Sequence, residues 1–332
     1  MRRARCSAHR KKSKTGEKDM SKKAKEALKN GTMTKRQWTW LMMKRYKVGY
    51  FMVAPFMLLF FVFTIIPVVA SLFVGFTDYN MLEVPNWVGL DNYITLFLED
   101  DLFITALKNT LIFAVSVGPT SFILSFIVAW FINELSPKTR SVVTLIFYAP
   151  SISGGAFTIF QYIFASDSYG LVNGWLLKLG FTDSPILFFT DVKYIMPLCI
   201  AVALWMSLGT SFLSFVAGLQ GIDRAQFEAA SVDGITNRWQ ELWYVTLPNM
   251  KPQLMFGSVM AITGSFGFGA VVTALAGNPS TDYVAYTISH HIEDYGGARM
   301  EIGYSSAISF VLFLIMISAN MFVSKLLSKV GE

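Results

Sequence analysis

The chain carries few charged residues. Lys, Arg, Asp and Glu make up 15% of its 332 residues, against 53% hydrophobic residues, and the mean hydropathy is +0.47. A soluble globular domain is about 25% charged, so this composition indicates a protein of the lipid bilayer. Six apolar segments are long enough to cross a hydrocarbon core of roughly 30 Å. They cover about residues 50–76, 110–132, 142–165, 195–219, 254–276 and 303–324.

None of the six segments contains Asp, Glu, Lys, Arg or His. Soluble helices keep a polar stripe along one face, which these segments do not have. The sequence therefore predicts an all-α integral membrane protein with six transmembrane helices. Ion-coupled carriers and pumps need ionisable groups inside the membrane, so the pattern argues against both classes.

The apolar segments do contain residues that break helices in soluble proteins. Neighbouring helices and polar side chains satisfy the freed backbone groups in a membrane, and small residues let helices pack closely. The dense glycine cluster at 264–269 is open to a second interpretation, in which it lines a path or moves between states. The helix-breaking residues are Pro55, Pro67, Pro119, Pro150, Gly154, Gly155, Gly264, Gly267 and Gly269.

Motifs of several enzyme classes are also missing. The sequence has no G-x-x-x-x-G-K-[ST] phosphate loop and no His-Glu-x-x-His in a span, which argues against that mode of ATP binding and against an intramembrane zinc protease.

Cys6 lies in the basic tail and Cys199 in a span, so no disulfide framework is expected. Adjacent His290 and His291 cannot share a helix face, and no metal site is expected there. A polar path without its own energy source suggests a passive channel or a permease driven by a partner.

Positive charge is concentrated near the N-terminus. Residues 1–47 hold 17 of the 28 Lys and Arg and only three acids, which leaves 11 bases and 19 acids in the remainder. Beside a first transmembrane span, the positive-inside rule is a simpler cause than nucleic-acid binding. We expect a cytoplasmic tail that touches anionic lipid headgroups and no nucleic-acid partner. Its low apolar content predicts disorder up to about Trp38.

The loops between the segments alternate in charge. Residues 77–105 contain six acids and no Lys or Arg, as expected outside, whereas the short turn 133–141 contains Lys138 and Arg140, as expected inside. By alternation the loop 277–302 lies outside, and the loop 223–248 and both termini lie in the cytoplasm. Lys178 and Lys193, in a predicted outer loop, are the exceptions to this pattern.

The polar loop 223–248 has the signals of an ordered element. Asp223 suits a helix N-cap, with Gln226 three residues later for a capping-box-like start, and Gly234 suits the C-cap. A second short helix is predicted from about residue 237 to 245, and Pro248 marks the entry to the next span.

One face of the predicted first helix in this loop is shallow. Ala229 and Ala230 would let a partner approach the backbone closely, and Phe227 and Trp239 are residue types that often anchor interfaces. An amphipathic helix lying on lipid would explain the aromatic residues, but not paired alanines followed by a glycine. The loop is therefore predicted to be a docking element.

This loop resembles a known motif. Glu228-Ala229-Ala230, then three residues and Gly234, with Leu247-Pro248 at the end, is similar to the EAA loop of inner-membrane subunits of binding-protein-dependent ABC importers. The resemblance covers about residues 48–327. Ten residues separate Gly234 from Val245, one more than this family usually has, so the turn at 235–237 should differ. Further motifs resemble the carbohydrate branch, which includes maltose, multiple-sugar and glycerol-phosphate permeases: Val88-Gly89-Leu90-Asp91-Asn92-Tyr93, Leu107-Lys108-Asn109-Thr110-Leu111, Ala217-Gly218-Leu219-Gln220 and Gly303-Tyr304-Ser305-Ser306-Ala307-Ile308-Ser309.

The resemblance implies a type I ABC importer permease fold. Residues 1–47 would be the tail and 48–327 the six-helix permease domain, with the EAA coupling loop 223–248 between helices 4 and 5. The protein would be a multi-pass component of a bacterial or archaeal cell membrane that imports a carbohydrate, in particular an oligosaccharide. Its partners would be a second permease subunit, two cytoplasmic ATPase subunits and an extracytoplasmic sugar-binding protein. ATP and Mg²⁺ would bind the ATPase subunits, and no cofactor would bind this chain.

The resemblance also assigns roles to individual residues. Glu228 would engage a cleft of the ATPase through charge-assisted hydrogen bonds, which are about twice as strong as neutral ones. The coupling element carried over from the family consists of Glu228, Ala229, Ala230, Gly234, Leu247 and Pro248.

Candidates for a sugar path come from residue chemistry. Ligand pockets combine apolar and aromatic walls with a few polar groups, and five residues of the spans fit that description, although each also suits packing in a helical core. They are Tyr148, Gln161, Trp205, Ser265 and Phe266.

Two other classes of function remain as alternatives. A polytopic membrane enzyme of lipid-linked sugar metabolism would have its best carboxylate cluster at Glu99, Asp100 and Asp101, which is predicted to lie outside and has no basic phosphate clamp beside it. A self-contained channel would leave the EAA-like loop without a purpose.

Overall fold

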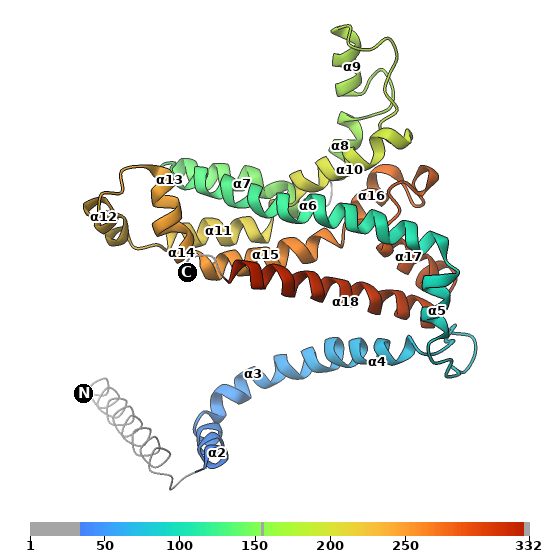
Figure 1. Cartoon of the computed structure of the whole chain (residues 1–332), viewed down its shortest axis with the longest axis horizontal. Helices are drawn as coiled ribbons and strands as arrows, with labels where there is room; N and C mark the ends of the chain where they lie inside the picture. The colour runs from blue at the N-terminus through green and yellow to red at the C-terminus, as the bar shows by residue number, and fades with distance from the viewer. Residues whose placement is uncertain (1–33, 154–155, 329–332) are drawn as a thin grey trace, which may run out of the picture. The chain divides into compact units, whose positions relative to one another are not determined.

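A computed structural model describes residues 34–153 and 156–328 (Figure 1). Residues 1–33 of the predicted tail, and Gly154 and Gly155 of the third apolar segment, lie outside the described residues. The chain divides into two compact units, residues 1–70 and residues 71–332. In the part that the structure describes, the fold is helical, as predicted, and extended pairing is limited to one isolated bridge between Thr77 and Trp87.

The first unit begins, among the described residues, with a capped helix. Thr34 Oγ1 accepts from the backbone N–H of Gln37 at 3.4 Å, and Gln37 Oε1 accepts from the backbone N–H of Thr34 at 3.0 Å. This capping box starts a helix at Lys35. Residues 35–38, at the end of the predicted tail, are helical in the structure, and the disorder expected for the tail stays a prediction. The elements of this unit are α2 (Lys35–Arg45), α3 (Lys47–Phe60), the π-helical turn η1 (Phe61–Ile65) and the beginning of α4 (Ile66–Val74).

The second unit contains six helices of eleven or more residues within its described residues. They are α6 (Asp101–Asn133), α7 (Pro137–Ile152), α10 (Val192–Met206), α11 (Thr210–Gln220), α15 (Lys251–Ser265) and α18 (Ile302–Leu327). The shorter elements are α5 (Asp91–Leu98), α8 (Ala156–Ile163), α9 (Leu171–Lys178), α12 (Arg224–Val232), α13 (Arg238–Glu241), η2 (Leu242–Thr246), α14 (Leu247–Asn249), α16 (Gly269–Ala276), η3 (Thr281–Tyr283), α17 (Ile288–Glu293) and η4 (Asp294–Ala298).

Four helical stretches of the described residues are long and apolar enough to cross a membrane. Two further pairs of helices meet the same criterion only when taken together: α7 with α8, which meet at 89°, and α15 with α16, which meet at 44°. The structure thus has between four and six candidate spans. The second bend coincides with the glycine cluster 264–269, and glycines are a common cause of helix kinks. The four continuous stretches are Lys47–Val74, Asp101–Asn133, Val192–Gln220 and Ile302–Leu327.

The core of the second unit follows α6 along its length. Phe126 and Ala129 pack with Phe215 and other side chains of α11 and α15 near the end of α6. Its middle packs against α10 and α16, and its beginning packs against α5 and α18. Small residues permit the close contact of α11 with α15, because a side chain at Gly257 would overlap the ring of Phe215.

The length of α6 sets the distance between two polar ends of this unit. Its 33 residues extend about 50 Å at 1.5 Å per residue, which exceeds the roughly 30 Å of a hydrocarbon core. In Figure 1, α5 and α17 lie where α6 begins, and α12 and α13 lie where it ends.

Residues of the carbohydrate-branch motifs hold together the end where α6 begins. Asn109 Nδ2 donates to the backbone carbonyls of Tyr283, at 3.0 Å, and Tyr286, at 2.9 Å. Asn92 Nδ2 likewise donates to two carbonyls of the segment 75–77, at 3.0 and 2.9 Å. These motif residues therefore have a structural role, in which side-chain amides satisfy loop carbonyls that no helix pairs.

Asp100 is the centre of a buried polar cluster at this end. One carboxylate oxygen accepts from the backbone N–H of Phe103 at 2.8 Å, and the other accepts from Tyr304 Oη and from His291 Nε2, both at 2.9 Å. Burial by itself would raise the pKa of Asp100, but these hydrogen bonds and the adjacent His291 hold its pKa below the ordinary value of 3.8. Asp100 is thus engaged as an ionised helix cap.

Burial favours the neutral form of both histidines of α17. Burial lowers the pKa of His290 and of His291 from 6.5, and for His291 burial outweighs the opposing effect of Asp100. Because a carboxylate can only accept, the proton of His291 lies on Nε2. His290 Nδ1 accepts from the N–H of Thr287 at 3.0 Å, so its proton also lies on Nε2, which faces Thr273 Oγ1 at 3.0 Å.

We predict that the folded protein loses stability as the pH falls below 6.5. The pKa values of both histidines are depressed in the folded state, so the unfolded chain binds protons first, and the stabilisation present above pH 6.5 is lost as the histidines protonate. His291→Gln keeps a donor near the Nε2 position and does not titrate, so its melting temperature should depend less on pH. Thermal unfolding in detergent between about pH 7.5 and about pH 5.5 tests this, and equal pH dependence in the two proteins would contradict it.

Candidate functional site

The first helix of the loop 223–248 begins at the predicted cap. Asp223 Oδ1 accepts from the backbone N–H of Ala225 at 3.1 Å, and α12 starts at Arg224. Gln226 does not complete the capping-box-like start that we expected. Its side-chain oxygen instead accepts from Asn249 Nδ2 at 2.5 Å, so Gln226 ties α12 to α14, 23 residues later in the chain.

The same helix ends at the predicted glycine. Gly234 has φ +91°, in the left-handed region that strains residues with a Cβ atom. The N–H of Ile235 donates to the carbonyl of Ala230 at 3.0 Å, and the N–H of Gly234 donates to that of Ser231 at 3.2 Å. This pair of bonds is a Schellman motif, so Gly234 ends α12 through its backbone conformation.

The second helix is longer than predicted. Asn237 caps it by accepting from the N–H of Trp239 at 3.0 Å, and α13 then continues through the π-helical turn η2 into α14. Leu247 and Pro248 form the start of α14, directly before α15 begins at Lys251. A π turn holds more residues than an α turn, so η2 offers a place for the extra residue of this loop in addition to the turn 235–237.

Two contacts join the second helix to the end of α6. Arg238 Nη2 lies 2.6 Å from Glu134 Oε2, and Arg238 Nη1 lies 3.3 Å from Glu241 Oε1. The rings of Trp239 and Trp130 lie 5.4 Å apart at 50°. Arg238 and Glu134 are 61% and 43% exposed, so their ion pair contributes at most about 1 kcal/mol. The position of this ion pair is more informative than its energy, because the pair connects the loop 223–248 directly to α6.

The exposed surface of the loop differs in part from the predicted one. Glu228, Ala229 and Gly234 are exposed, whereas Ala230 is buried and Leu247 and Pro248 are half-buried. The shallow face therefore belongs to Ala229 and not to both alanines. Sequence reasoning missed three further exposed apolar residues. These residues are Val232 (88% exposed), Trp243 (63%) and Tyr244 (72%). An apolar side chain in an otherwise polar loop is the sequence signal that could have identified them.

The structure does not gather the five path candidates in one place. Ser265 and Phe266 are buried at the break between α15 and α16, where Ser265 Oγ donates to the carbonyl of Ile262. Gln161 Nε2 donates to a carbonyl of α16, at residue 274, so it joins α8 to that helix. Trp205 is half-exposed and lines an apolar cavity of about 350 Å³ between α7, α8 and α10.

Tyr148, the fifth candidate, packs half-buried against the core cluster near the end of α6. The candidates thus occupy four separate environments, and their role in a sugar path stays a prediction.

Comparisons with known proteins identify the family. Residues 103–331 match the model of the "Binding-protein-dependent transport system inner membrane component" family. The chain belongs to this family. Its members are transport components and not enzymes, and as a family member with several apolar helices this chain is a multi-pass membrane protein. The membrane-enzyme alternative therefore has no support.

Curated relatives of this transport component are permease proteins. It is 32% identical to the probable ABC transporter permease protein YesP of Bacillus subtilis (strain 168) over 274 residues, which is 81% of this chain and 86% of YesP. It is 30% identical to the arabinooligosaccharides transport system permease protein AraP of the same organism, over 87% of this chain and 91% of AraP.

A solved structure shows the same fold for the transport component. A chain of a bacterial ABC transporter involved in the import of the acidic polysaccharide alginate is 27% identical, with a TM-score of 0.69, over 89% of this chain and 99% of that chain. A second structure shows the alginate transporter in complex with an alginate pentasaccharide-bound periplasmic protein, with 26% identity and a TM-score of 0.69.

We predict that, if the loop docks on an ATPase as the family resemblance implies, Gly234→Val weakens that docking. A β-branched residue is strained at φ +91°, and a strain of about 1–2 kcal/mol corresponds to roughly tenfold weaker binding. Gly180 is a matched control, because it ends α9 with φ +71° and the same pair of backbone bonds, from Phe181 to Leu176 and from Gly180 to Leu177. Gly180→Val should bind normally. Equal co-purification of an ATPase with the two variants would contradict the role of the loop.

A second prediction concerns the contact of the loop with α6. Arg238→Glu places a carboxylate beside Glu134 and Glu241 and removes an interaction of about 0.7 kcal/mol. If the loop couples to an ATPase, a loss of that size should lower ATP hydrolysis by the assembled complex by up to roughly threefold. The double variant Arg238→Glu with Glu134→Arg restores the opposite charges and should recover activity. A double variant as impaired as the single one would show that the pair has no part in coupling.

Proposed function

We propose that this chain is one permease subunit of an ATP-driven ABC importer for a carbohydrate, in particular an oligosaccharide. It would form the translocation path with a second, related permease subunit. An extracytoplasmic binding protein would deliver the sugar, and two cytoplasmic ATPase subunits would supply the energy. The observation that carries the proposal is similarity over four-fifths or more of the chain to permeases named for arabinooligosaccharides, for lactose and, in a solved structure, for alginate import.

The loop 223–248 supports the cytoplasmic half of this proposal. It is a doubly capped helix pair with a fixed connection to α6, and its exposed surface presents Glu228, Ala229 and Val232. A small residue beside large apolar ones suits insertion into a protein cleft. The coupling residues, with ATP and Mg²⁺ held by the partner ATPases, belong to this proposal.

The charge pattern supports the orientation. The end of the second unit that carries α12 and α13 also includes the turn with Lys138 and Arg140, and Lys251 and Lys325 lie there too. The segment before α6 carries acids and no bases. By the positive-inside rule, the loop 223–248 and both termini face the cytoplasm of a bacterial or archaeal cell.

We predict that Glu228→Lys separates membrane insertion from coupling. The variant keeps α12, because lysine is as good a helix former as glutamate, but it reverses the charge offered to the ATPase. The purified wild-type complex should contain a second permease and an ATPase whose hydrolysis rises with loaded binding protein. The variant should insert normally and lose this stimulation.

Glu83→Lys is the control for that experiment. Glu83 is exposed in the predicted outer loop, and the same charge change there should leave hydrolysis unaffected. Normal stimulation of the Glu228→Lys complex would refute the coupling role. Transport by the lone chain without an ATPase would refute the importer itself.

A further inference from the structure

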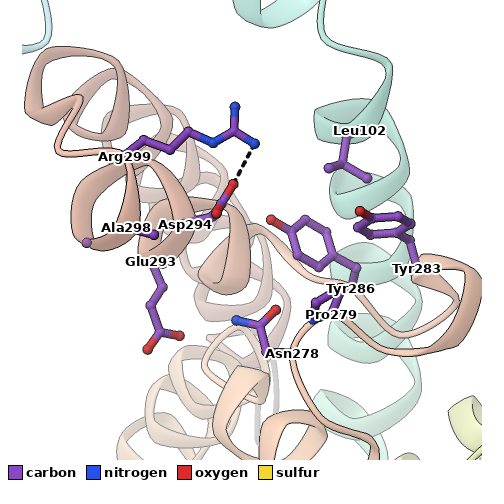
Figure 2. Close-up of a pocket in the computed structure, with 10 residues that line it drawn as sticks. Leu102, Asn278, Pro279, Tyr283, Tyr286, Glu293, Asp294, Ala298 and Arg299 are labelled. Atoms are coloured by element: carbon purple, nitrogen blue, oxygen red, sulfur yellow. Dashed lines mark ion pairs between the residues drawn. The ribbon is translucent and has the colours of Figure 1, made fainter.

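A cavity with a mixed polar and apolar lining lies at the end of the second unit where α6 begins. It measures about 510 Å³, within the range of 300–1,000 Å³ that small-molecule sites occupy. Figure 2 shows Tyr283 and Tyr286 on one side, the Asp294–Arg299 ion pair on the other, and Asn278 between them. The function proposed above does not use this cavity, and none of the sugar-path candidates from the sequence lines it.

The tyrosine wall of the cavity is held rigidly. Tyr286 is 3% exposed and stacks on His290, with ring centroids 5.5 Å apart at 23°. The ring of Tyr283 stands at 84° to that of Tyr286, with centroids 5.3 Å apart, and remains 41% exposed. Asn109 holds the backbone carbonyls of both tyrosines from α6. One exposed aromatic ring is therefore presented on a fixed support.

The backbone of this wall is in an unusual conformation. Asp282 and Tyr283 have φ of 49° and 56°, in the left-handed region that costs energy for residues with a Cβ atom. Such strain persists where the surrounding structure enforces it, and it often marks functional sites. Here it fixes the position at which the ring of Tyr283 projects.

The opposite wall is an oriented set of hydrogen-bonding groups. Arg299 Nη2 lies 2.8 Å from Asp294 Oδ2, and the guanidinium lies over the ring of Tyr295 at 4.1 Å. A guanidinium has five N–H groups, so donors remain after this ion pair. Glu293 and Asn278 add a carboxylate and an amide to the lining. The cavity thus offers both donors and acceptors beside an aromatic face.

These features together specify a class of ligand. A sugar ring has apolar C–H faces that pack on aromatic rings and hydroxyl groups that both donate and accept hydrogen bonds. The lining has two carboxylates, Glu293 and Asp294, against the single guanidinium of Arg299, so a ligand carboxylate would meet an excess of like charge. The cavity favours a neutral sugar unit over a uronate.

We propose that this cavity is an outer subsite of the permease for a neutral glycosyl unit of the imported oligosaccharide. The proposal rests on the function and orientation inferred above. The subsite would hold one ring of the chain on arrival, with its C–H face on Tyr283 and its hydroxyl groups bonded to Asn278, Glu293 and Arg299.

Direct binding to the complete transporter in lipid nanodiscs, without binding protein or ATP, tests the subsite. The probes are arabinotriose and lactose, which are neutral, and trigalacturonate, which carries a carboxylate on each ring. Saturation-transfer difference NMR should detect at least one neutral probe on the wild type, and trigalacturonate should bind about fivefold more weakly. Failure of both neutral probes to bind, or equal binding of trigalacturonate, would overturn the proposal.

Variants locate the binding within the protein. Tyr283→Ala and Asn278→Ala should each weaken binding of the neutral probe about fivefold. Glu293→Lys, at an exposed position, should shift the preference toward trigalacturonate. Tyr169→Ala is the matched control, because Tyr169 is 88% exposed in a different predicted outer segment. If these variants weaken docking of the binding protein but leave sugar binding unchanged, the cavity is a contact site for the binding protein, and the subsite proposal is wrong.

The same samples separate this proposal from the one on which it rests. Adding binding protein, sugar and ATP measures stimulated hydrolysis, and a complex without stimulation by any sugar would refute the importer function. Stimulation with unchanged sugar binding in the cavity variants would refute the subsite alone.

Discussion

The free-energy cost of placing a charged group in hydrocarbon determines where charged residues occur in this protein. A charged side chain at the bilayer centre is strongly disfavoured, and the six apolar segments contain no Asp, Glu, Lys, Arg or His. Many of the charged groups of the second unit lie near the two ends of α6, which are about 50 Å apart. Where α6 begins, Asp100, His291 and the cavity residues form one polar region. Where it ends, Arg238 joins the loop 223–248 to Glu134, and Lys251 Nζ donates to a carbonyl at the end of α18.

The region between these ends contributes packing and little chemistry. The hydroxyl groups of buried Ser121, Ser258 and Ser265 each donate to a carbonyl three residues earlier in the same helix, so their hydrogen-bonding capacity is used locally. Under the function proposed above, a force from the ATPase subunits would reach these helices at the end that carries the loop 223–248. The loop 223–248 suits that role, because its helix caps and its contacts with α6 and α14 hold it in one conformation. At the glycine-rich break between α15 and α16, the two helices meet at 44°.

Local sequence rules predicted the parts of the site that depend on neighbouring residues. Asp223 and Gly234 begin and end α12 as expected, because a cap needs only the adjacent backbone. Contacts between distant residues were beyond such rules. Gln226 bonds Asn249, and His291 bonds Asp100 from 191 residues away. The burial of Ala230 and the π turn η2 also depend on tertiary packing, so no periodicity revealed them.

The central claim is that the loop 223–248 faces the cytoplasm and transmits force from an ATPase. The most direct test is to find from which side of the membrane a cysteine in this loop can be labelled. Val232 on α12 and Tyr169 before α9 are each 88% exposed, and each can be changed to cysteine after Cys6 and Cys199 are replaced by alanine. A membrane-impermeant maleimide should label Tyr169→Cys in spheroplasts. Val232→Cys should react only in inside-out vesicles, and the bound ATPase should protect it. Labelling of Val232→Cys from the outside of spheroplasts would contradict the account.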